Sequence, residues 1–420
     1  MKRKNKIANK IKPGTKRVLF YTSSSYGFRS WTIWYAYEVS QVYPVILLSE
    51  KLDPDTEAIL KNKEFFPKLE EIVYVKHPSS SLKLMVKNNK ALHREAKEVI
   101  EKYKPDIVIT GGLVYPFPLY LRRIAERNGA INVCTFSPRI YTSKEISSYV
   151  KLMSAYSGKL KFMPFCISFF WESIRKQLGH FLYYWILPIM AGEKPFRDEP
   201  GCILFKGIKG RSADYYVSFL KQDYDNALMD GMPPEKLSYQ PKIYPEGYNK
   251  VREFSRNRFA YKKTGRVLTI MWPHSRIGIK KEDHSLITEE TLREQRIKVL
   301  CVITEMLANW KIIIKPHPDA KDEECQYIKD TFGGVSGNIE IINKTEWAEM
   351  YGSISDVVIG MPPVSSTLYN ISLHSPNVII LSLDFEHELL GDGYKNFAGI
   401  KYIDSLEKFV QILKVIKHSF

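Results

Sequence analysis

The 420-residue sequence is too long for one ordinary hydrophobic core, so two or three domains are expected, and two is the simplest interpretation. Hydrophobic residues make up 44% and aromatic residues 13% of the chain, which excludes a disordered protein. The formal net charge of +16 favours partners that carry negative groups, such as phosphates, nucleic acid or an anionic membrane.

The first 17 residues are strongly basic and contain no acidic side chain. Their eight basic residues are Lys2, Arg3, Lys4, Lys6, Lys10, Lys12, Lys16 and Arg17. We expect a flexible arm, either solvated or adhering to anionic lipid. No apolar stretch of the signal-peptide type follows it, and the five cysteines lack the spacing of a disulfide framework or a metal site. Both observations favour a cytoplasmic protein with reduced cysteines.

Short apolar runs alternate with helical patterns through the first half of the chain. Strands are expected at residues 18–21, 45–48, 72–75 and 106–110, and Gly111 and Gly112 close the last of them. Helices are expected at residues 31–39, 90–102 and 119–128. Buried strands that alternate with helices predict a parallel sheet covered on both faces.

The same alternation restarts at residue 266, after a polar and basic stretch typical of an interdomain linker. Strands are expected at residues 266–271, 311–314, 339–342, 356–359 and 378–381, and a long helix at residues 289–308. The sequence therefore predicts an α/β protein with two Rossmann-like, doubly wound domains facing each other across a cleft. The expected parts are the arm 1–17, a first domain 18–245, a linker 246–264 and a second domain 265–420.

Residues 140–200 form an aromatic insertion with two apolar runs, at 162–171 and 181–190. Each run is shorter than the roughly 20 residues that span a bilayer, and basic residues lie between them. Two interpretations stay open: helices packed on the first domain, or a monotopic patch in the membrane interface. In the second, the protein would be peripheral on the inner face of the cell membrane.

The most informative motif follows the predicted strand at 311–314, where the sequence reads Lys315-Pro316-His317-Pro318. Ligands of open α/β sheets bind at the carboxyl ends of strands, and this is such an end. The two prolines restrict the backbone around His317, whose imidazole would contact a phosphate and protonate it as it leaves. Lys315 would add a positive charge for the same anion.

A second motif, Ser365-Ser366-Thr367, lies between a predicted strand and a predicted helix. Free backbone N–H groups and the helix dipole attract an anion at such a helix N-terminus, and the hydroxyls supply further donors. Taken alone, Ser365 would equally well be an ordinary helix cap. Together with Lys315 and His317 on a neighbouring strand end, the three residues predict a phosphate-binding site.

Weaker candidates also follow predicted strands. His274 and Arg276 would neutralise a diphosphate, although ordinary loop polarity explains them equally well, and Glu386 would touch a ribose or base. The remaining candidates for the cleft are Ser24, Ser25, Gly27, Gly111 and Gly112. The sequence contains no HExxH motif and no His/Cys cluster at metal-ligand spacing, so we expect a mechanism without a metal ion.

The pair formed by Lys315-Pro316-His317-Pro318 and Ser365-Ser366-Thr367 resembles the HP and SS/ST motifs of bacterial GT-B sialyltransferases and polysialyltransferases. Related patterns occur in capsule Kdo transferases and in CDP-glycerol glycerophosphotransferases. Residues 213–218, with 231–237 after them, also resemble the closing strand, helix and loop of a GT-B first domain. The resemblance covers roughly residues 205–385 at the level of motifs.

This resemblance implies an inverting glycosyltransferase that moves a sugar from a nucleotide donor to a cell-surface glycan or lipid-linked acceptor. The donor would be a CMP-activated sialic acid or Kdo-like sugar by preference, or a UDP-sugar, and no cofactor is needed because the nucleotide sugar is a substrate. His317 would contact the donor phosphate, and Ser365, Ser366 and Thr367 would hold it. The first domain would bind the acceptor and the second the donor, in the synthesis of a capsule or other cell-envelope polysaccharide.

One family feature is missing from the sequence. The sialyltransferases carry an acidic Asp/Glu-Asp/Glu-Gly motif as catalytic base, but Glu70 and Glu71 are followed by Ile72 rather than glycine. Glu38 and His77 are the other candidates, and the base is left unassigned. The alternatives are a CDP-glycerol-type glycerophosphotransferase, a UDP-sugar 2-epimerase and a non-catalytic nucleotide-sugar-binding protein. Nucleic acid is not expected as a partner, because basic residues outside the arm are dispersed.

Overall fold

A computed structural model describes residues 16–23, 33–77, 82–111, 116–135, 152, 178, 181–195, 213–218, 221–229, 232–240, 265–273, 278–318, 320, 322–332, 338–343, 346–361, 366–375, 377–389, 391, 395 and 399–419. The chain divides into two compact units, of which the first contains the elements from β1 to β7 and the second those from β8 to α16. The predicted linker 246–264 and most of the predicted insertion 140–200 lie outside the described residues. The predicted domain boundaries therefore stay predictions.

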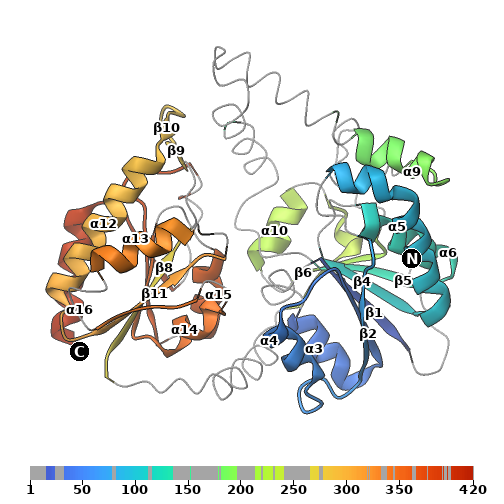
Figure 1. Ribbon diagram of the computed structural model, residues 1–420, viewed down its shortest axis with the longest axis horizontal. Helices are drawn as coiled ribbons and strands as arrows, with labels where there is room; N and C mark the ends of the chain where they lie inside the picture. Colours follow the sequence, from blue (N-terminus) through green and yellow to red (C-terminus); the bar gives the residue numbers. More distant parts are fainter. Residues whose placement is uncertain are drawn as a thin grey trace. The chain divides into compact units, whose positions relative to one another are not determined.

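The first unit is built on a parallel sheet of seven strands in the order β3-β2-β1-β4-β5-β6-β7 (Figure 1). Its strands are β1 (Val18–Thr22), β2 (Val45–Ser49), β3 (Leu69–Tyr74), β4 (Ile107–Gly111), β5 (Ile131–Thr135), β6 (Tyr215–Ser218) and β7 (Leu237–Tyr239). Its helices are α3 (Ile33–Val42), α4 (Pro54–Lys61), α5 (Leu82–Tyr103), α6 (Pro116–Arg127), α9 (Leu187–Met190) and α10 (Lys221–Met229), with short turns η2 (Leu182–Ile186) and η3 (Pro234–Lys236).

The central strands of this sheet are mostly apolar because both of their faces are covered. Every residue of β1 and of β2 is buried. On one face, Leu19 and Tyr21 of β1 pack in a cluster with Leu92 of α5 and Phe117 of α6. The continuous apolar run, rather than an alternating one, is what identified these strands in the sequence.

The second unit repeats this plan with a parallel sheet of six strands in the order β12-β11-β8-β13-β14-β15. Its strands are β8 (Val267–Trp272), β11 (Lys311–Pro316), β12 (Ile339–Ile341), β13 (Val357–Gly360), β14 (Ile379–Leu383) and β15 (Ile400–Ile403). An antiparallel hairpin of β9 (Gly278–Ile279) and β10 (Leu286–Ile287) stands apart from the sheet. The helices are α12 (Glu289–Met306), α13 (Asp322–Phe332), α14 (Ala348–Ile354), α15 (Ser366–His374) and α16 (Leu406–Ser419).

The order of the second sheet contains a reversal beside its first strand. From β8 the chain runs outward through β11 and β12, then returns to the other side of β8 for β13, β14 and β15. The helices α12, α13 and α16 cover one face, and α14 and α15 cover the other (Figure 1). The two parallel, helix-covered sheets confirm the predicted α/β class with two Rossmann-like domains.

No helix within the described residues has both the length and the apolar character needed to cross a bilayer.

Candidate functional site

At the carboxyl edge of the second sheet, the strands that precede the two predicted motifs, β11 and β13, lie on either side of β8. The strand β8 pairs with β11 on one side and with β13 on the other, all three in parallel. Adjacent strands lie about 4.8 Å apart, so the ends of β11 and β13 are separated by about 10 Å across the end of β8. In a doubly wound sheet, ligands bind at the carboxyl edge where the strand order reverses, which here is the end of β8 and β13.

His317 is fixed at this edge by its backbone. Its N–H donates to the carbonyl of Trp272 at 2.8 Å, which extends the pairing of β11 with β8 by one residue. Its carbonyl accepts from the N–H of Ala320 at 2.9 Å, so the chain turns directly after the histidine. The residue is half-buried. Hydrogen bonds thus hold the backbone of His317 on both sides.

Lys315 lies one step below this edge and does not reach out of the sheet. Its side chain belongs to a residue only 2% exposed, and its Nζ donates to the carbonyl of Pro316 at 2.6 Å. The ammonium charge therefore sits under the loop that carries His317. A direct contact between Lys315 and an anion stays a prediction. Even without such a contact, its positive charge raises the electrostatic potential at the nearby carboxyl edge of the sheet.

The helix α15 begins at Ser366 and packs closely against the end of β13. A Cβ atom at Gly360 would lie 2.3 Å from Cδ1 of Leu368 in the first turn of α15, so only glycine permits this approach. The N-terminus of α15 is thereby brought to the edge beside β8. Thr367 is half-buried in that first turn, Ser365 lies outside the described residues, and the side chain of Ser366 is not described.

Beneath the edge, a buried ionic cluster fixes Trp272, the last residue of β8. The indole N–H donates to Oε1 of Glu324 on α13 at 2.8 Å, and Nη1 of Arg296 on α12 lies 3.1 Å from the same oxygen. Arg296 is 1% exposed, and its guanidinium lies 5.8 Å from the centre of the Trp272 ring. The carbonyl of the same tryptophan accepts from His317. Two helices therefore position the strand end that supports His317.

The residues after β14 fold back along the hairpin. Leu389 donates its N–H to Ile279, and Lys281 donates its N–H to the carbonyl of His387. Asp384 accepts hydrogen bonds from the backbone N–H of Glu388 at 2.8 Å and from the hydroxyl of Tyr402 at 2.5 Å. Burial raises the pKa of the Asp384 carboxyl, and these hydrogen bonds offset the rise only in part.

Two carboxylates of this segment differ in their surroundings. Glu386 is bound at both oxygens, by Nζ of Lys280 at 2.8 Å and by the side-chain amide of Gln295 on α12. Glu388 is 3% exposed and its side chain approaches Gly278, where an added Cβ would lie 3.5 Å from Oε1. The contact of Glu386 with a ribose or base stays a prediction. In the structure, its bonds to Lys280 and Gln295 hold the segment after β14 in place.

The first unit also has a carboxyl edge at its reversal point. The strands β1 and β4 pair there, with Tyr21 opposite Thr110, so Gly111 lies next to Thr22. Ser24, Ser25, Gly27 and Gly112 were predicted to border this edge, and all four lie outside the described residues. His274 and Arg276, predicted to neutralise a diphosphate in the second unit, also lie outside them.

His77, one of the two candidate bases, contacts a carboxylate. Its Nδ1 lies 2.9 Å from Oε2 of Glu95 on α5, and the other oxygen of Glu95 accepts from the N–H of Lys76 at 2.6 Å. Glu38 is half-buried on α3. No group of His, Cys, Asp and Glu within the described ranges is arranged to hold a metal ion.

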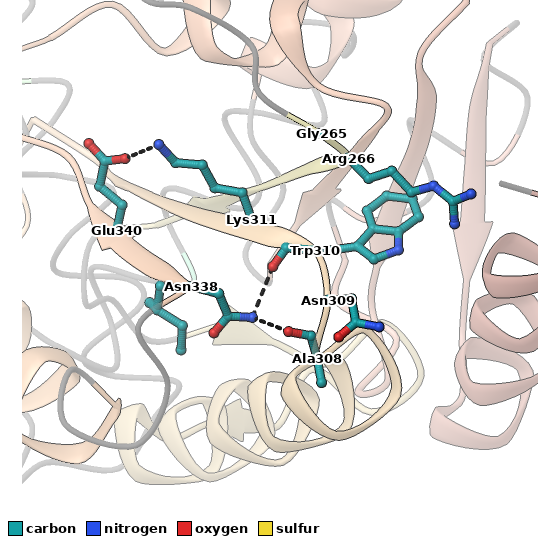
Figure 2. Close-up of a pocket in the computed structure, with 9 residues that line it drawn as sticks. Gly265, Arg266, Ala308, Asn309, Trp310, Lys311, Asn338 and Glu340 are labelled. Atoms are coloured by element: carbon teal, nitrogen blue, oxygen red, sulfur yellow. Dashed lines mark hydrogen bonds and ion pairs between the residues drawn. The ribbon is translucent and has the colours of Figure 1, made fainter.

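A hollow of about 560 Å³ lies at the opposite, amino edge of the second sheet, beside the starts of β8, β11 and β12 (Figure 2). The amide of Asn338 spans it by donating to the carbonyls of Ala308 and Trp310, at 2.8 and 2.9 Å. Lys311 pairs with Glu340 at 2.6 Å on its rim. Because ligands of parallel sheets bind at carboxyl ends, this hollow is not the candidate site.

No protein-family model and no curated protein match the sequence. Solved structures match nearly the whole chain. A putative UDP-N-acetylglucosamine 2-epimerase from Listeria monocytogenes aligns with a TM-score of 0.58 at 12% identity, over 97% of this chain and 89% of that one. The UDP-GlcNAc 2-epimerase from Neisseria meningitidis, bound to UDP-GlcNAc, gives 0.52 at 12% identity, over 96% and 92%. The glycotransferase of kitacinnamycin gives 0.52 at 11% identity, over 97% and 92%.

The chain has the GT-B fold. Both the epimerases and the glycotransferase share its two Rossmann-like domains, which confirms the fold that the motifs implied. Identities of 11–12% establish the shared architecture, and function has to be argued from the residues of this chain.

Proposed function

We propose that this protein is a glycosyltransferase that uses a nucleotide-activated sugar and holds the donor phosphates at the carboxyl edge of β8, β11 and β13. The observation that carries the proposal is the position of β8 between the two motifs. His317 follows β11 on one side of β8, and the N-terminus of α15 abuts β13 on the other. A diphosphate lying across the end of β8 would be within reach of both.

The chemistry requires stabilisation of the leaving nucleotide. An oxygen of the acceptor forms a bond to the anomeric carbon of the sugar, the bond from that carbon to the donor phosphate breaks, and its electron pair leaves with the phosphate. His317 would share a proton with the phosphate oxygen as negative charge develops. The N–H groups at the start of α15 would stabilise the same charge without reorganising. A separate base must take the acceptor proton, and we assign no residue to it.

A second candidate is a UDP-sugar 2-epimerase. It is favoured by the solved structures of similar fold, several of which are described as UDP-N-acetylglucosamine 2-epimerases, one with UDP-GlcNAc bound. The same edge would hold the diphosphate of UDP. The reaction differs because the C2–H bond of the sugar must break and re-form on the opposite face.

These structures also bear on the donor. The preference for CMP rests on the likeness of the two motifs to CMP-sugar enzymes, whereas the ligand named for the Neisseria structure is a UDP-sugar. UDP therefore ranks beside CMP as the nucleotide to test first.

Calorimetric titration with CMP, CDP, UDP and GDP, without added metal, tests the site. One nucleotide should bind selectively to the wild type, and His317→Ala and Ser366→Ala should each weaken that binding about tenfold or more, the loss expected for a hydrogen bond to a charged group. His418→Ala, in the exposed last turn of α16, is the matched histidine control and should bind as the wild type does. Failure of all four nucleotides to bind would overturn the proposal.

Incubation of UDP-GlcNAc with the protein in D₂O separates the two enzymes. An epimerase must exchange the C2 hydrogen with solvent, so deuterium at C2, detected by NMR, would favour the second candidate. A transferase leaves C2 untouched and releases nucleotide only when an acceptor is supplied. Selective binding with neither reaction, across CMP- and UDP-sugars and glycan acceptors, would favour a non-catalytic binding protein.

A further inference from the structure

The first unit carries a surface on which basic and apolar side chains adjoin. We define the α5–α9 surface by Lys83, Val86, Lys87, Lys90 and Arg94 on α5 and by Leu178, Phe181, Ile189 and Met190 on and before α9. This surface is not part of the carboxyl edges of the sheets, and the proposed reaction does not involve it.

The basic part of this surface is a stripe along the first half of α5. Lys83, Lys87, Lys90 and Arg94 are spaced by four, three and four residues, which places them on one face of the helix. All four are exposed, and none forms an ion pair within the described part of the chain. Residues 82–94 contain no acidic residue, so this part of α5 carries only positive side-chain charge.

The apolar part lies on the segment that contains η2 and α9. Leu178, Ile189 and Met190 are 62%, 56% and 48% exposed, which is high for large apolar residues close together in the sequence. Phe181 is also exposed, and its ring stacks on that of Trp185 with the centres 5.9 Å apart. Residues 181–192 contain no charged side chain.

Hydrogen bonds join the two parts into one surface. The side-chain amide of Asn89 on α5 donates to the carbonyl of Leu187 at 2.7 Å, and Nε2 of His93 lies 2.8 Å from Oε1 of Glu193, just after α9. The helix α9 therefore lies along α5, as Figure 1 shows. Val86 precedes Asn89 by one turn on the same side and, being exposed, continues the apolar part towards the basic stripe.

We propose that the α5–α9 surface docks on an anionic lipid bilayer. The lysines and arginine would lie at the level of the head groups, and Phe181, Ile189 and Met190 would enter the boundary with the acyl chains. Charge complementarity selects this partner. A second copy of the chain, docked through the same surface by a two-fold axis, would bring two surfaces of the same positive charge together, which is unfavourable. An anionic surface neutralises the stripe and covers the apolar side chains at once.

Binding to sucrose-loaded vesicles, measured by co-sedimentation at low ionic strength, tests this proposal. The full-length protein should bind vesicles of phosphatidylcholine mixed with phosphatidylglycerol, and it should bind those of phosphatidylcholine alone far less. Lys87→Glu combined with Lys90→Glu should weaken the partitioning by roughly tenfold to a hundredfold, because each basic residue near an anionic surface is worth about fivefold. Ile189→Ser combined with Met190→Ser should weaken it through lost apolar burial, and added salt should not abolish this difference.

The matched controls lie on α16 of the second unit, which also presents exposed lysines beside an exposed apolar residue. Lys414→Glu combined with Lys417→Glu changes the net charge by the same amount, and Val415→Ser removes a side chain that is 65% exposed. Both should bind vesicles as the wild type does, and thermal melts should show that every variant is folded. Wild-type failure to bind, or equal losses in the α16 controls, would overturn the proposal. So would a change of oligomeric state, in sedimentation velocity, that is confined to the α5–α9 variants in the absence of lipid.

Discussion

Trp272 connects the interior of the second unit to its carboxyl edge. Its indole is bound to Glu324 and its carbonyl to the N–H of His317, so one residue transmits the positions of α12 and α13 to the loop that carries the histidine. Arg296 and Glu324 are both nearly buried, and their charges are paired in a region of low dielectric. An arrangement of this kind holds a side chain in place before a ligand arrives, which is what stabilisation of a leaving phosphate needs.

Removing the carboxylate of this cluster should destabilise the second unit. Glu324→Ala deletes the partner of the Trp272 indole and of the Arg296 guanidinium, and we expect a loss of about 2–3 kcal/mol in the free energy of unfolding. Glu323→Ala, at the exposed neighbouring position of α13, should change it by less than about 0.5 kcal/mol. Urea unfolding measures both. If both substitutions changed the free energy of unfolding equally, the buried cluster would contribute no more to stability than an exposed side chain does.

Asp384 should make the stability of the protein fall as the pH rises. Because its pKa is higher in the folded state than in the unfolded chain, the folded protein binds the proton more strongly. The free energy of unfolding should therefore decline from roughly pH 4, the unfolded pKa, through the raised folded pKa, and the penalty is complete above it. Asp384→Asn removes this titration with little change of shape, so the decline should be smaller in the variant.

Asp404 is the control with the opposite sign. A hydrogen bond from Lys408 lowers the pKa of its carboxyl, so its contribution to stability is present above the unfolded pKa and is lost as the pH falls through the folded one. Asp404→Asn should weaken the loss of stability in acid and leave the decline above pH 4 in place. Thermal melts across the acid range compare the two variants. A decline that is unchanged in Asp384→Asn would remove Asp384 as its source.

The positions of His317 and of the start of α15 were predicted because each follows a buried strand, His317 directly and α15 after residues 361–365. Position near a strand end can be deduced from periodicity. The predicted contact of Lys315 with an anion stays a prediction, and in the structure its ammonium donates to the carbonyl of Pro316. Arg296 and Glu324 were not predicted. Both lie on helices among other charged residues, and only the packing of α12 and α13 on β8 buries these two and leaves their neighbours in solvent.

At the scale of elements, α15 depends on two glycines that let it approach its neighbours. Gly360 at the end of β13 faces Leu368 in the first turn of α15, and Gly352 in α14 faces Ile371 one turn later. An added Cβ would lie 2.3 Å from Leu368 and 2.2 Å from Ile371. Since contacts this short cannot persist, either substitution must displace the helix or the side chain that it meets.

Gly360→Ala and Gly352→Ala should each lower the free energy of unfolding by about 1–3 kcal/mol through overpacking. They should differ in ligand binding. Gly360→Ala acts on the end of α15 that is proposed to hold the phosphate, so the selected nucleotide should bind more weakly than the lost stability explains. Gly352→Ala acts on the middle of the helix and should leave affinity near the wild-type value. Calorimetry measures the affinity and thermal melts measure the stability of both variants. Equal affinities would show that the start of α15 does not contact the nucleotide.

The bounds of the strands were predicted more closely than those of helix α5. The strands β1, β2, β4, β8, β11, β13 and β14 were predicted within a few residues because each consists mainly of apolar residues. The helix α5 was predicted to begin at Lys90, because Asn88 and Asn89 before it are poor helix formers. In the structure it begins at Leu82. Tertiary contacts override this preference, because Asn89 bonds to Tyr120 and to Leu187. The strands β5 and β15 were missed because Asn132 in β5 and Lys401 in β15 interrupt the apolar run by which the other strands were identified.

At the scale of the whole molecule, each unit presents a carboxyl edge at its reversal of strand order, and the α5–α9 surface adds a third region with a distinct chemistry. The excess of positive charge is a property of the entire chain, yet its action is local because salt screens exposed charges beyond about 10 Å. Two sets of basic residues, those of residues 1–15 and those of α5, can each contribute to membrane binding. Variants that remove one set at a time measure the two contributions.

Deletion of residues 2–15 removes six basic residues and lowers the formal net charge from +16 to +10. The deletion stops before Arg17, whose backbone N–H bonds to Asp106 and whose guanidinium bonds to the carbonyl of Tyr103. We expect nucleotide binding to be unchanged and vesicle binding to be reduced but still dependent on phosphatidylglycerol, because the α5–α9 surface remains. Co-sedimentation at several salt concentrations should give a shallower salt dependence than that of the full-length protein.

Combining the deletion with Lys87→Glu and Lys90→Glu tests whether the two regions act independently. Independent contributions add in free energy, so the logarithm of the partition coefficient should fall by the sum of the two separate losses. A combined loss much smaller than that sum would mean that the arm and α5 compete for the same lipid. If the deletion alone abolished binding, the arm would carry the whole interaction and the α5–α9 surface would have to be covered by something else.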